Sequence, residues 1–376
     1  MADPNQPRYV HTDTPHPHVS ASSPPDANPK KNVWPSYYIE LQSLGSGAYG
    51  TVVEAVDKRN GRKVAIKKQF TNFSVVDKKA KPVLALRAYR ELLLLWTFRG
   101  HPNILHLLDA FPLQADATMG TLCTVTNKVD TDLAAALQHK RIKPDMRPII
   151  MYGVLCGMKY IHSADAIHRD LKPSNIGISF DDTGNVRDVR LLDFGLARKL
   201  KVEMSYVVQT MWYRAPEVWL QPGRYTKAID LWSVGCILAE LITGQVLMRG
   251  GTAFGAQLET IYGYLGEAGK DFLETVDPSY IEMMHKFEKE KSSSQRIRLS
   301  EVLPGSTEQE RDLLDNLFRW NPDQRFTAAR CLEHPYFADI VQKKGLGARY
   351  LGAHPETLQD FENWDYRTRL LDQMGR

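Results

Sequence analysis

The residues best suited to chemistry in this 376-residue chain form one charged run, His168-Arg169-Asp170-Leu171-Lys172-Pro173-Ser174-Asn175. Asp170 can accept a hydrogen bond from a substrate hydroxyl and orient it for in-line attack on phosphorus. Lys172 can neutralise charge on a transferred phosphoryl group, and Asn175 can offer its carbonyl oxygen to Mg²⁺. An ordinary surface loop would also be charged, but the spacing of these residues favours phosphoryl transfer.

A second acidic element, Asp193-Phe194-Gly195, follows the apolar strand pattern Val189-Arg190-Leu191-Leu192. Gly195 permits a sharp backbone turn, and Asp193 can hold a Mg²⁺ ion that bridges two phosphates. By itself such a tripeptide indicates only a turn. In series with the first run it indicates a metal site, whose predicted ligands are Asn175 and Asp193.

A glycine-rich turn lies between two strand patterns and reads Gly45-Ser46-Gly47-Ala48-Tyr49-Gly50-Thr51-Val52. Glycines let the backbone approach phosphate oxygens and direct N–H groups at them. A flexible hairpin could have the same composition, and dinucleotide-binding oxidoreductases share the glycine spacing. Their fingerprint needs a helix directly after the loop, whereas a strand pattern follows here, which argues against an oxidoreductase.

Lys67 ends the strand pattern Val64-Ala65-Ile66-Lys67, and Glu91 lies in the helix predicted over Leu84 to Phe98. A single lysine is more often a surface residue. An ion pair between Lys67 and Glu91 would instead hold the ammonium group against the α- and β-phosphates of a nucleotide.

Composition excludes several classes of protein. The hydrophobic fraction is 43% and the formal net charge is +4, without the concentrated basic patch of a nucleic-acid binder. The four cysteines form no CxxC pair, so neither a disulfide framework nor a zinc site is expected. The strongest apolar stretch, Ile229 to Thr243, is too short to span a bilayer, and no signal peptide is evident. We expect a soluble intracellular protein that binds neither membrane nor nucleic acid.

The order of the patterns predicts an α+β fold with two lobes. Residues 1–36 are rich in Pro and Ser and are expected to be disordered. Strand patterns dominate the small lobe, 37–129, with a hairpin turn at Asn60-Gly61. The large lobe, 130–337, is mainly helical, with helices predicted over Arg147–Ser163, Ala228–Thr243, Ala256–Leu265, Glu308–Trp320 and Ala328–His334.

Over roughly residues 38 to 337 the chain resembles a eukaryotic protein kinase. Trp212-Tyr213-Arg214-Ala215-Pro216-Glu217-Val218 resembles the proline-directed group, and Arg87-Ala88-Tyr89-Arg90-Glu91-Leu92 resembles the αC helix of MAP kinases, particularly the stress-activated ones. The resemblance implies ATP and Mg²⁺ as cofactors. It implies phosphorylation of Ser or Thr, mainly before Pro, in protein substrates of a signalling cascade.

The resemblance also implies the nucleotide contacts. Thr126 matches the gatekeeper behind the adenine pocket, Lys128 and Val129 match the hinge, and Asp132 matches the residue that meets the ribose. Leu44 and Ala65 complete the predicted ATP site together with the glycine-rich turn, Lys67 and Glu91.

Three structural roles follow from the same resemblance. Asp230 matches a buried residue that anchors the catalytic loop, and Arg325 matches the ion-pair partner of Glu217. Residues 338–376 match a C-terminal extension that packs back on the kinase lobes.

The activation loop departs from the MAP kinase pattern Thr-x-Tyr. Ser205, Tyr206 and Val207 occupy the three positions, and Met211 replaces the arginine that helps bind phosphotyrosine. The phosphothreonine receptors are kept, since Arg87, Arg90 and Arg169 could converge on a phosphate. We hypothesise activation by a single phosphate on Ser205; the alternative is that Ser205 and Tyr206 both stay unmodified.

Expected partners are protein substrates, an upstream kinase and a phosphatase, and a monomer is expected. The acidic docking patch of MAP kinases is missing after Phe337, which leaves docking-peptide recognition open. A cytoplasmic location is expected, with nuclear entry undetermined. The alternative function, a pseudokinase scaffold, would be favoured if Lys67, Asp170 or Asp193 were replaced, and all three are present.

Overall fold

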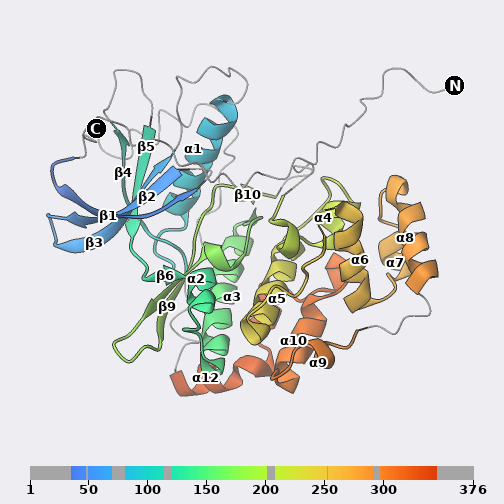
Figure 1. Ribbon diagram of the computed structural model, residues 1–376. Coiled ribbons are helices and arrows are strands. Elements are labelled where there is room, and N and C mark those ends of the chain that lie inside the picture. Colours follow the sequence, from blue (N-terminus) through green and yellow to red (C-terminus); the bar gives the residue numbers. More distant parts are fainter. Residues whose placement is uncertain are drawn as a thin grey trace, which may run out of the picture.

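The computed structural model describes residues 35–47, 50–69, 81–113, 121–200, 208–251, 253–291 and 297–344. These residues form the expected two lobes. A strand-rich lobe with one long helix sits at the upper left of Figure 1, and a helical lobe fills the lower right. All but the last two residues of the predicted N-terminal tail, and most of the C-terminal extension, lie outside the described residues.

The small lobe is built on one antiparallel sheet with strand order β1-β2-β3-β5-β4. Asn60 and Gly61 lie in the turn between β2 and β3, as predicted, and Gly61 has a φ of 71° that favours glycine. The side chains of one sheet face pack into a small core with Val53, Ile66 and Val125. The five strands are β1 (Tyr38–Gly47), β2 (Gly50–Asp57), β3 (Arg62–Gln69), β4 (Leu107–Leu113) and β5 (Thr121–Asn127).

The long helix α1 (Lys81–Thr97) joins the small lobe to the core of the large one. Its inner residues, Leu92 to Leu95, belong to the same buried cluster as Phe98 and Phe194. Phe98, directly after α1, lies against Phe194, with the ring centroids 5.9 Å apart, so the end of α1 is close to the segment that holds Asp193.

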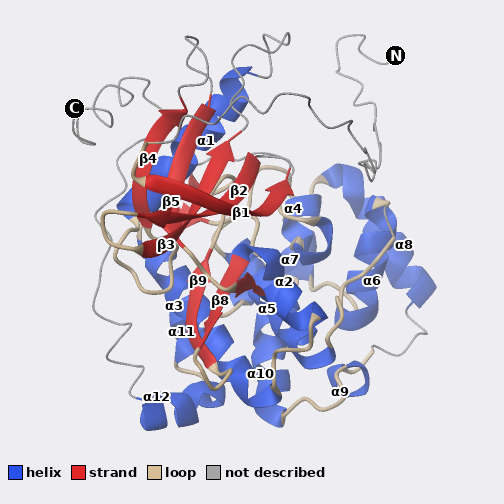
Figure 2. Cartoon of the chain, turned by 60° about the vertical axis from the view of Figure 1, so that its left-hand side comes forward, coloured by secondary structure: helices blue, strands red, loops and turns tan. Residues whose placement is uncertain are grey.

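The large lobe is mainly helical, and Figure 2 shows its helices below the sheet. Two predicted helices have the predicted bounds, and three others differ by two or three residues at one end. Six helices, α2, α4, α7, α8, α9 and α12, were not predicted. The helices are α2 (Leu133–Gln138), α3 (Arg147–Ser163), α4 (Pro216–Leu220), α5 (Ala228–Thr243), α6 (Phe254–Leu265), α7 (Lys270–Leu273), α8 (Pro278–Lys291), α9 (Leu299–Val302), α10 (Glu308–Leu317), α11 (Ala328–Leu332) and α12 (Ala338–Lys344).

Short strands lie near the junction of the lobes. β6 (Thr131–Asp132), β8 (Ile176–Phe180) and β9 (Val186–Leu191) form a three-stranded sheet, and β7 (Ala166–Ile167) pairs with β10 (Arg198–Lys199). These strands bracket the two segments predicted to carry chemistry, so both segments leave from hydrogen-bonded backbone.

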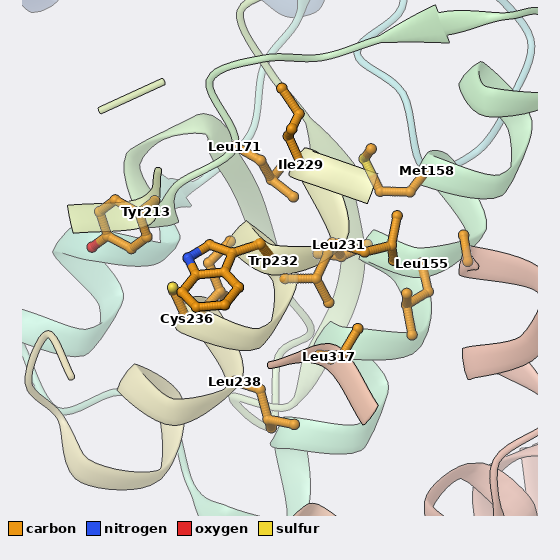
Figure 3. Packing of buried hydrophobic residues seen from close by; sticks show 14 of the residues in the cluster. Leu155, Met158, Leu171, Tyr213, Ile229, Leu231, Trp232, Cys236, Leu238 and Leu317 are labelled. Atoms are coloured by element: carbon orange, nitrogen blue, oxygen red, sulfur yellow. The ribbon is translucent and has the colours of Figure 1, made fainter. Parts of the chain in front are cut away.

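Helix α5 forms the centre of the large lobe. Almost all its residues are buried, as is typical of a helix that is apolar on every side. Figure 3 shows Trp232 of this helix packed among side chains from α3, α10 and the segment around Leu171. The helix ends at Gly244, whose φ of 73° satisfies a left-handed C-cap.

One buried ion pair fixes the end of the activation segment to this core. Both oxygens of Glu217 accept hydrogen bonds from the Arg325 guanidinium, at 2.6 Å each, and neither side chain is exposed. Arg325 also lies over the ring of Trp232. Since a buried charge without its partner is strongly destabilising, the pair keeps α4 in place beside α5.

Candidate active site

Strand β3 and helix α1 meet through a lysine and a glutamate. Lys67 Nζ lies 2.6 Å from Oε1 of Glu91 and 3.7 Å from Oδ1 of Asp193. Burial alone would lower the pKa of Lys67, but these two carboxylates outweigh it and raise the pKa. Lys67 is therefore a fixed positive charge, and the pairing places it among buried groups rather than at the surface.

Asp193 is held in an uncommon backbone conformation, with a φ of 52°. Its Oδ1 accepts a hydrogen bond from the Gly195 amide at 3.1 Å. The intervening Phe194 is fully buried against Phe98 and His168. Burial would raise the pKa of Asp193, yet Lys67 and the Gly195 amide lower it overall, so the carboxylate stays ionised.

Asp170 is the centre of a second cluster. Its Oδ2 lies 2.8 Å from Lys172 Nζ and accepts a hydrogen bond from Asn175 Nδ2 at 3.2 Å. The same Asn175 nitrogen donates to the Asp170 carbonyl at 2.8 Å. The loop therefore presents a carboxylate and an ammonium group side by side, held by an amide from the next turn.

The two clusters belong to one site. The ring Nε2 of His168, at the start of the charged run, lies 3.0 Å from the carbonyl oxygen of Leu192, which directly precedes Asp193. The backbone amide of Leu192 also donates to the carbonyl of Asn175 at 2.9 Å, so the two segments are joined next to the predicted metal ligands. The structure thus gathers Lys67, Asp193, Lys172 and Asp170 from distant parts of the chain.

The donor set of Asn175 and Asp193 suits magnesium. Asp193 is an ionised carboxylate, and the Asn175 nitrogen is used by Asp170, which leaves its side-chain carbonyl as an acceptor. Mg²⁺ prefers oxygen ligands and usually takes only one or two carboxylates together with substrate phosphates. Within the described ranges there is no cluster of three or more His, Cys, Asp or Glu residues that would suit a metal held by protein alone.

Asp230 of helix α5 anchors the catalytic loop, the segment that carries Asp170. It is fully buried and accepts hydrogen bonds from the backbone amides of His168 and Arg169, at 2.8 and 2.9 Å. Its Oδ2 also lies 2.9 Å from His162 Nε2. Burial would raise the pKa of Asp230, but His162 and the loop amide lower it overall. These bonds support the left-handed backbone of Arg169, which has a φ of 66°.

The glycine-rich turn is partly described. Gly45 pairs with Val52 and Ser46 pairs with Thr51 across the β1–β2 hairpin, while Ala48 and Tyr49 lie outside the described residues. Gly47 lies opposite Gly50, and Leu44 is exposed on β1. Gly50 has no room for a side chain, since a Cβ would lie 2.0 Å from the carbonyl oxygen of Lys68.

The predicted adenine contacts follow β5 toward β6. Thr126 is buried and lies opposite Ala65 in the β3–β5 register. Lys128 Nζ lies 3.5 Å from the Val129 carbonyl. Asp132 caps helix α2, because its Oδ1 accepts a hydrogen bond from the Ala135 amide at 2.9 Å. One carboxylate oxygen of Asp132 is therefore committed to the helix cap.

The regulatory residues are only partly placed. Ser205 and Tyr206 lie outside the described residues, while Arg87 and Arg90 lie on α1. The Arg169 side chain is buried and donates to the Leu196 carbonyl at 2.6 Å and to the Tyr225 hydroxyl at 3.1 Å. Arg169 thus links the catalytic loop to the residue after Asp193-Phe194-Gly195 and to the segment between α4 and α5.

Two residues that contact or shape this site were missed from the sequence. Thr210 donates to Asp170 Oδ1 through its hydroxyl at 2.8 Å and its amide at 3.1 Å, and also binds Lys172. Gln209 has a φ of 68° and a buried side chain bonded to Ile229 and Ser233. Neither lies in a recognisable motif; their nearness to Trp212-Tyr213-Arg214 was the available signal.

Comparison with known proteins agrees with this geometry. A family model described as "Protein kinase domain" matches residues 38–337. Mitogen-activated protein kinase 12 of Mus musculus is 37% identical over 359 residues, covering 91% of this chain and 92% of the relative. The chain belongs to the mitogen-activated protein kinase family. Mitogen-activated protein kinase pmk-1 of Caenorhabditis elegans is 40% identical over 82% of this kinase and 78% of its own length.

A third relative gives the same result for the kinase. Mitogen-activated protein kinase 13 of Bos taurus is 38% identical, over 82% of this chain and 80% of the length of the relative. The family phosphorylates proteins on Ser or Thr and uses ATP as the phosphoryl donor. Among the described residues, no helix of the kinase is long and apolar enough to cross a membrane.

Replacing Asp230 by Asn is expected to destabilise the kinase by about 2–4 kcal/mol at pH 7, because its amide group cannot serve as acceptor for both loop amides. The lowered pKa of Asp230 means that this stability is present above the unfolded pKa of about 3.9 and is lost as pH falls through the lower folded pKa. Urea unfolding of both proteins should show a difference in the free energy of unfolding that persists between pH 7 and pH 5. If this difference vanished between pH 7 and pH 5, it would contradict the role of Asp230 as the acceptor of both loop amides.

Proposed function

We propose that this kinase transfers the γ-phosphoryl group of ATP to Ser or Thr of intracellular proteins, with Asp170, Lys172, Lys67 and Asp193 as the reacting site's charged groups. The observation that carries the proposal is that the Lys67–Asp193 pair and the Lys172–Asp170 pair lie on two segments that are joined by hydrogen bonds of Leu192 with His168 and with Asn175. Two lysines suit a triphosphate, and a carboxylate with an amide oxygen suits its magnesium ion.

The nucleotide would bind between the glycine-rich turn and the segment after β5. Lys67, kept in place by Glu91, would bind the α- and β-phosphates, and the amides of the turn would face phosphate oxygens. Asn175 and Asp193 would hold Mg²⁺, which when bound would neutralise phosphate charge. Thr126, Val129 and Asp132 would border the adenine and ribose.

Asp170 would act on the protein substrate. Its carboxylate would accept the hydrogen bond of the Ser or Thr hydroxyl, orient the oxygen for in-line attack and take the proton. The new bond would join that oxygen to the γ-phosphorus as the bond to the ADP oxygen breaks. Lys172, which is 2.8 Å from Asp170, would offset the charge on the phosphoryl oxygens.

A pseudokinase scaffold is the alternative, and no observation favours it. Such a protein would lack one of the charged groups that handle the nucleotide or the hydroxyl. Here Lys67 is paired, Asp193 is ionised, and Asp170 is held by Lys172 and Thr210.

A preference for Ser-Pro and Thr-Pro sites is supported by Gln209. Its positive φ turns the carbonyl toward Arg214, whose Nη2 donates to that oxygen at 2.7 Å. The carbonyl is then already used and cannot accept a hydrogen bond from a substrate amide. Proline has no amide hydrogen to leave unpaired, so it would be the favoured residue after the phosphorylated Ser or Thr.

The remaining biological assignments are also proposals. An upstream kinase would activate the monomeric, cytoplasmic enzyme by phosphorylating Ser205, and a phosphatase would reverse it. Arg87 and Arg90 on α1 and Arg169 beside the catalytic aspartate carry the positive charge that such a phosphate needs.

A phosphosite map of the active enzyme should show that Ser205 is phosphorylated. An unmodified Ser205 in fully active enzyme would overturn this route of activation.

Replacing Asp170 by Ala should reduce transfer of radiolabel from ATP to myelin basic protein by roughly 10²- to 10⁴-fold, since a positioned proton acceptor is lost. Asp182→Ala is the matched control, because Asp182 is an exposed aspartate in the β8–β9 turn. It should retain the activity of the natural enzyme. Equal labelling by the natural enzyme and Asp170→Ala would remove Asp170 from its proposed role.

Paired peptides that differ only in Pro or Ala after the target Ser should separate the specificity proposal from general activity. We expect kcat/KM to be roughly tenfold to a hundredfold higher for the Pro peptide, the range that an unpaired buried amide implies. Steady-state kinetics with both peptides measures this ratio. A ratio near one would show that the Gln209 carbonyl does not restrict the substrate.

A further inference from the structure

Gln69, the last residue of β3, is a polar side chain in a buried position. It is only 2% exposed and lies two residues after Lys67 on the same strand. Side chains two residues apart in a strand project from the same face of the sheet. Gln69 and Lys67 therefore both face α1.

Both side chains bind one carboxylate. Gln69 Nε2 donates to Oε2 of Glu91 at 3.0 Å, while Lys67 Nζ contacts Oε1 at 2.6 Å. The two oxygens of Glu91 are thus each held from the same strand. A carboxylate bound at both oxygens is restricted in rotation as well as in position.

The other end of the Gln69 side chain is not satisfied. Its Oε1 is buried and has no hydrogen-bond partner in the part of the chain that the structure describes. A buried acceptor without a partner costs free energy, which an apolar side chain of equal length would avoid. The glutamine is therefore poorly explained by stability, and its bond to Glu91 is the feature that distinguishes it from an apolar residue.

Gln69 also lies beneath the glycine-rich turn. It pairs with Gly50 in the β2–β3 register, where a Cβ on Gly50 would lie 3.2 Å from the Gln69 Cα. One residue thus touches the backbone that would cover the phosphates and the glutamate that holds Lys67. Its position connects two parts of the site that belong to different elements.

We propose that Gln69 is a positioning residue that holds Glu91, and with it helix α1, at ion-pairing distance from Lys67. The inference rests on the proposed function and adds a second tether to the Lys67–Glu91 pair. Helix α1 also carries Arg87 and Arg90, so a phosphate on the activation loop could tether the same helix through these arginines. The contribution of Gln69 is therefore largest in the dephosphorylated enzyme.

The test uses the full chain after phosphatase treatment and two variants. Gln69→Met keeps the length and removes the donor, and Gln69→Glu places a like charge beside Glu91. Gln42→Met is the matched control, because Gln42 Nε2 donates to Glu54 Oε2 at 2.8 Å in the same sheet, away from α1. The measurements are kcat and KM for ATP, amide hydrogen exchange over α1, and the urea midpoint of unfolding.

We expect Gln69→Met to lose about tenfold in kcat/KM for ATP, the size of a hydrogen bond to a charged group, and Gln69→Glu to lose more. Hydrogen exchange over α1 should rise in both variants, while the urea midpoint of Gln69→Met stays unchanged or increases. Phosphorylation of the activation loop should reduce the difference in kcat/KM between each Gln69 variant and the natural enzyme. The Gln42→Met control should match the natural enzyme in kcat/KM and in exchange over α1.

Unchanged activity and exchange in Gln69→Met would overturn the inference, as would a loss of activity that follows a loss of stability in parallel. Greater activity of Gln69→Glu than of Gln69→Met would also overturn it, since the added charge must repel Glu91. If the natural enzyme itself transferred no phosphate, the proposed function would fail. Hydrogen exchange over α1 would still decide the role of Gln69.

Discussion

An ion pair sets the distance between the sheet and helix α1, because Lys67 and Glu91 lie where water is largely excluded. Charges in such surroundings are costly unless they are paired, so separating them would be unfavourable for both elements. The same lysine lies 3.7 Å from Asp193 and keeps that carboxylate ionised. The position of α1 thus determines whether Lys67, the proposed phosphate-binding residue, and Asp193, the proposed metal ligand, lie together.

A second buried carboxylate organises the other half of the site. Asp230, in the first turn of the apolar helix α5, accepts hydrogen bonds from the amides of the catalytic loop. Trp232 and its neighbours pack this helix tightly, so the anchor cannot shift without opening the core. The catalytic loop is therefore anchored in the large lobe, and Glu91 on α1 supplies the partner of Lys67.

Much of the fold could be predicted because strong patterns carry it. The helices at Arg147–Ser163 and Ala228–Thr243 have long apolar stretches, and their predicted bounds agree with the structure. Helix α8 (Pro278–Lys291) was missed because its residues are mostly polar and leave a weak apolar stripe. The predicted helix at Glu308–Trp320 ends instead at Leu317, since Phe318 leaves the helical conformation just before Pro322.

The site was predictable to the extent that its residues occur in motifs. Local spacing was enough to name Asp170, Lys172, Asn175 and Asp193. Such spacing indicates which chemical groups are present, but it does not give the distances between them. Gln69 and Gln209 could not be named in this way, because a single glutamine has no sequence signal and acts only through tertiary contacts.

The most direct test of the account is a crystal structure of the kinase with Mg²⁺ and a non-hydrolysable ATP analogue. The account predicts Lys67 at the α- and β-phosphates, the metal on oxygens of Asp193 and Asn175, and the γ-phosphate facing Lys172 and Asp170. A nucleotide bound elsewhere, or bound with these side chains directed away from its phosphates, would contradict it.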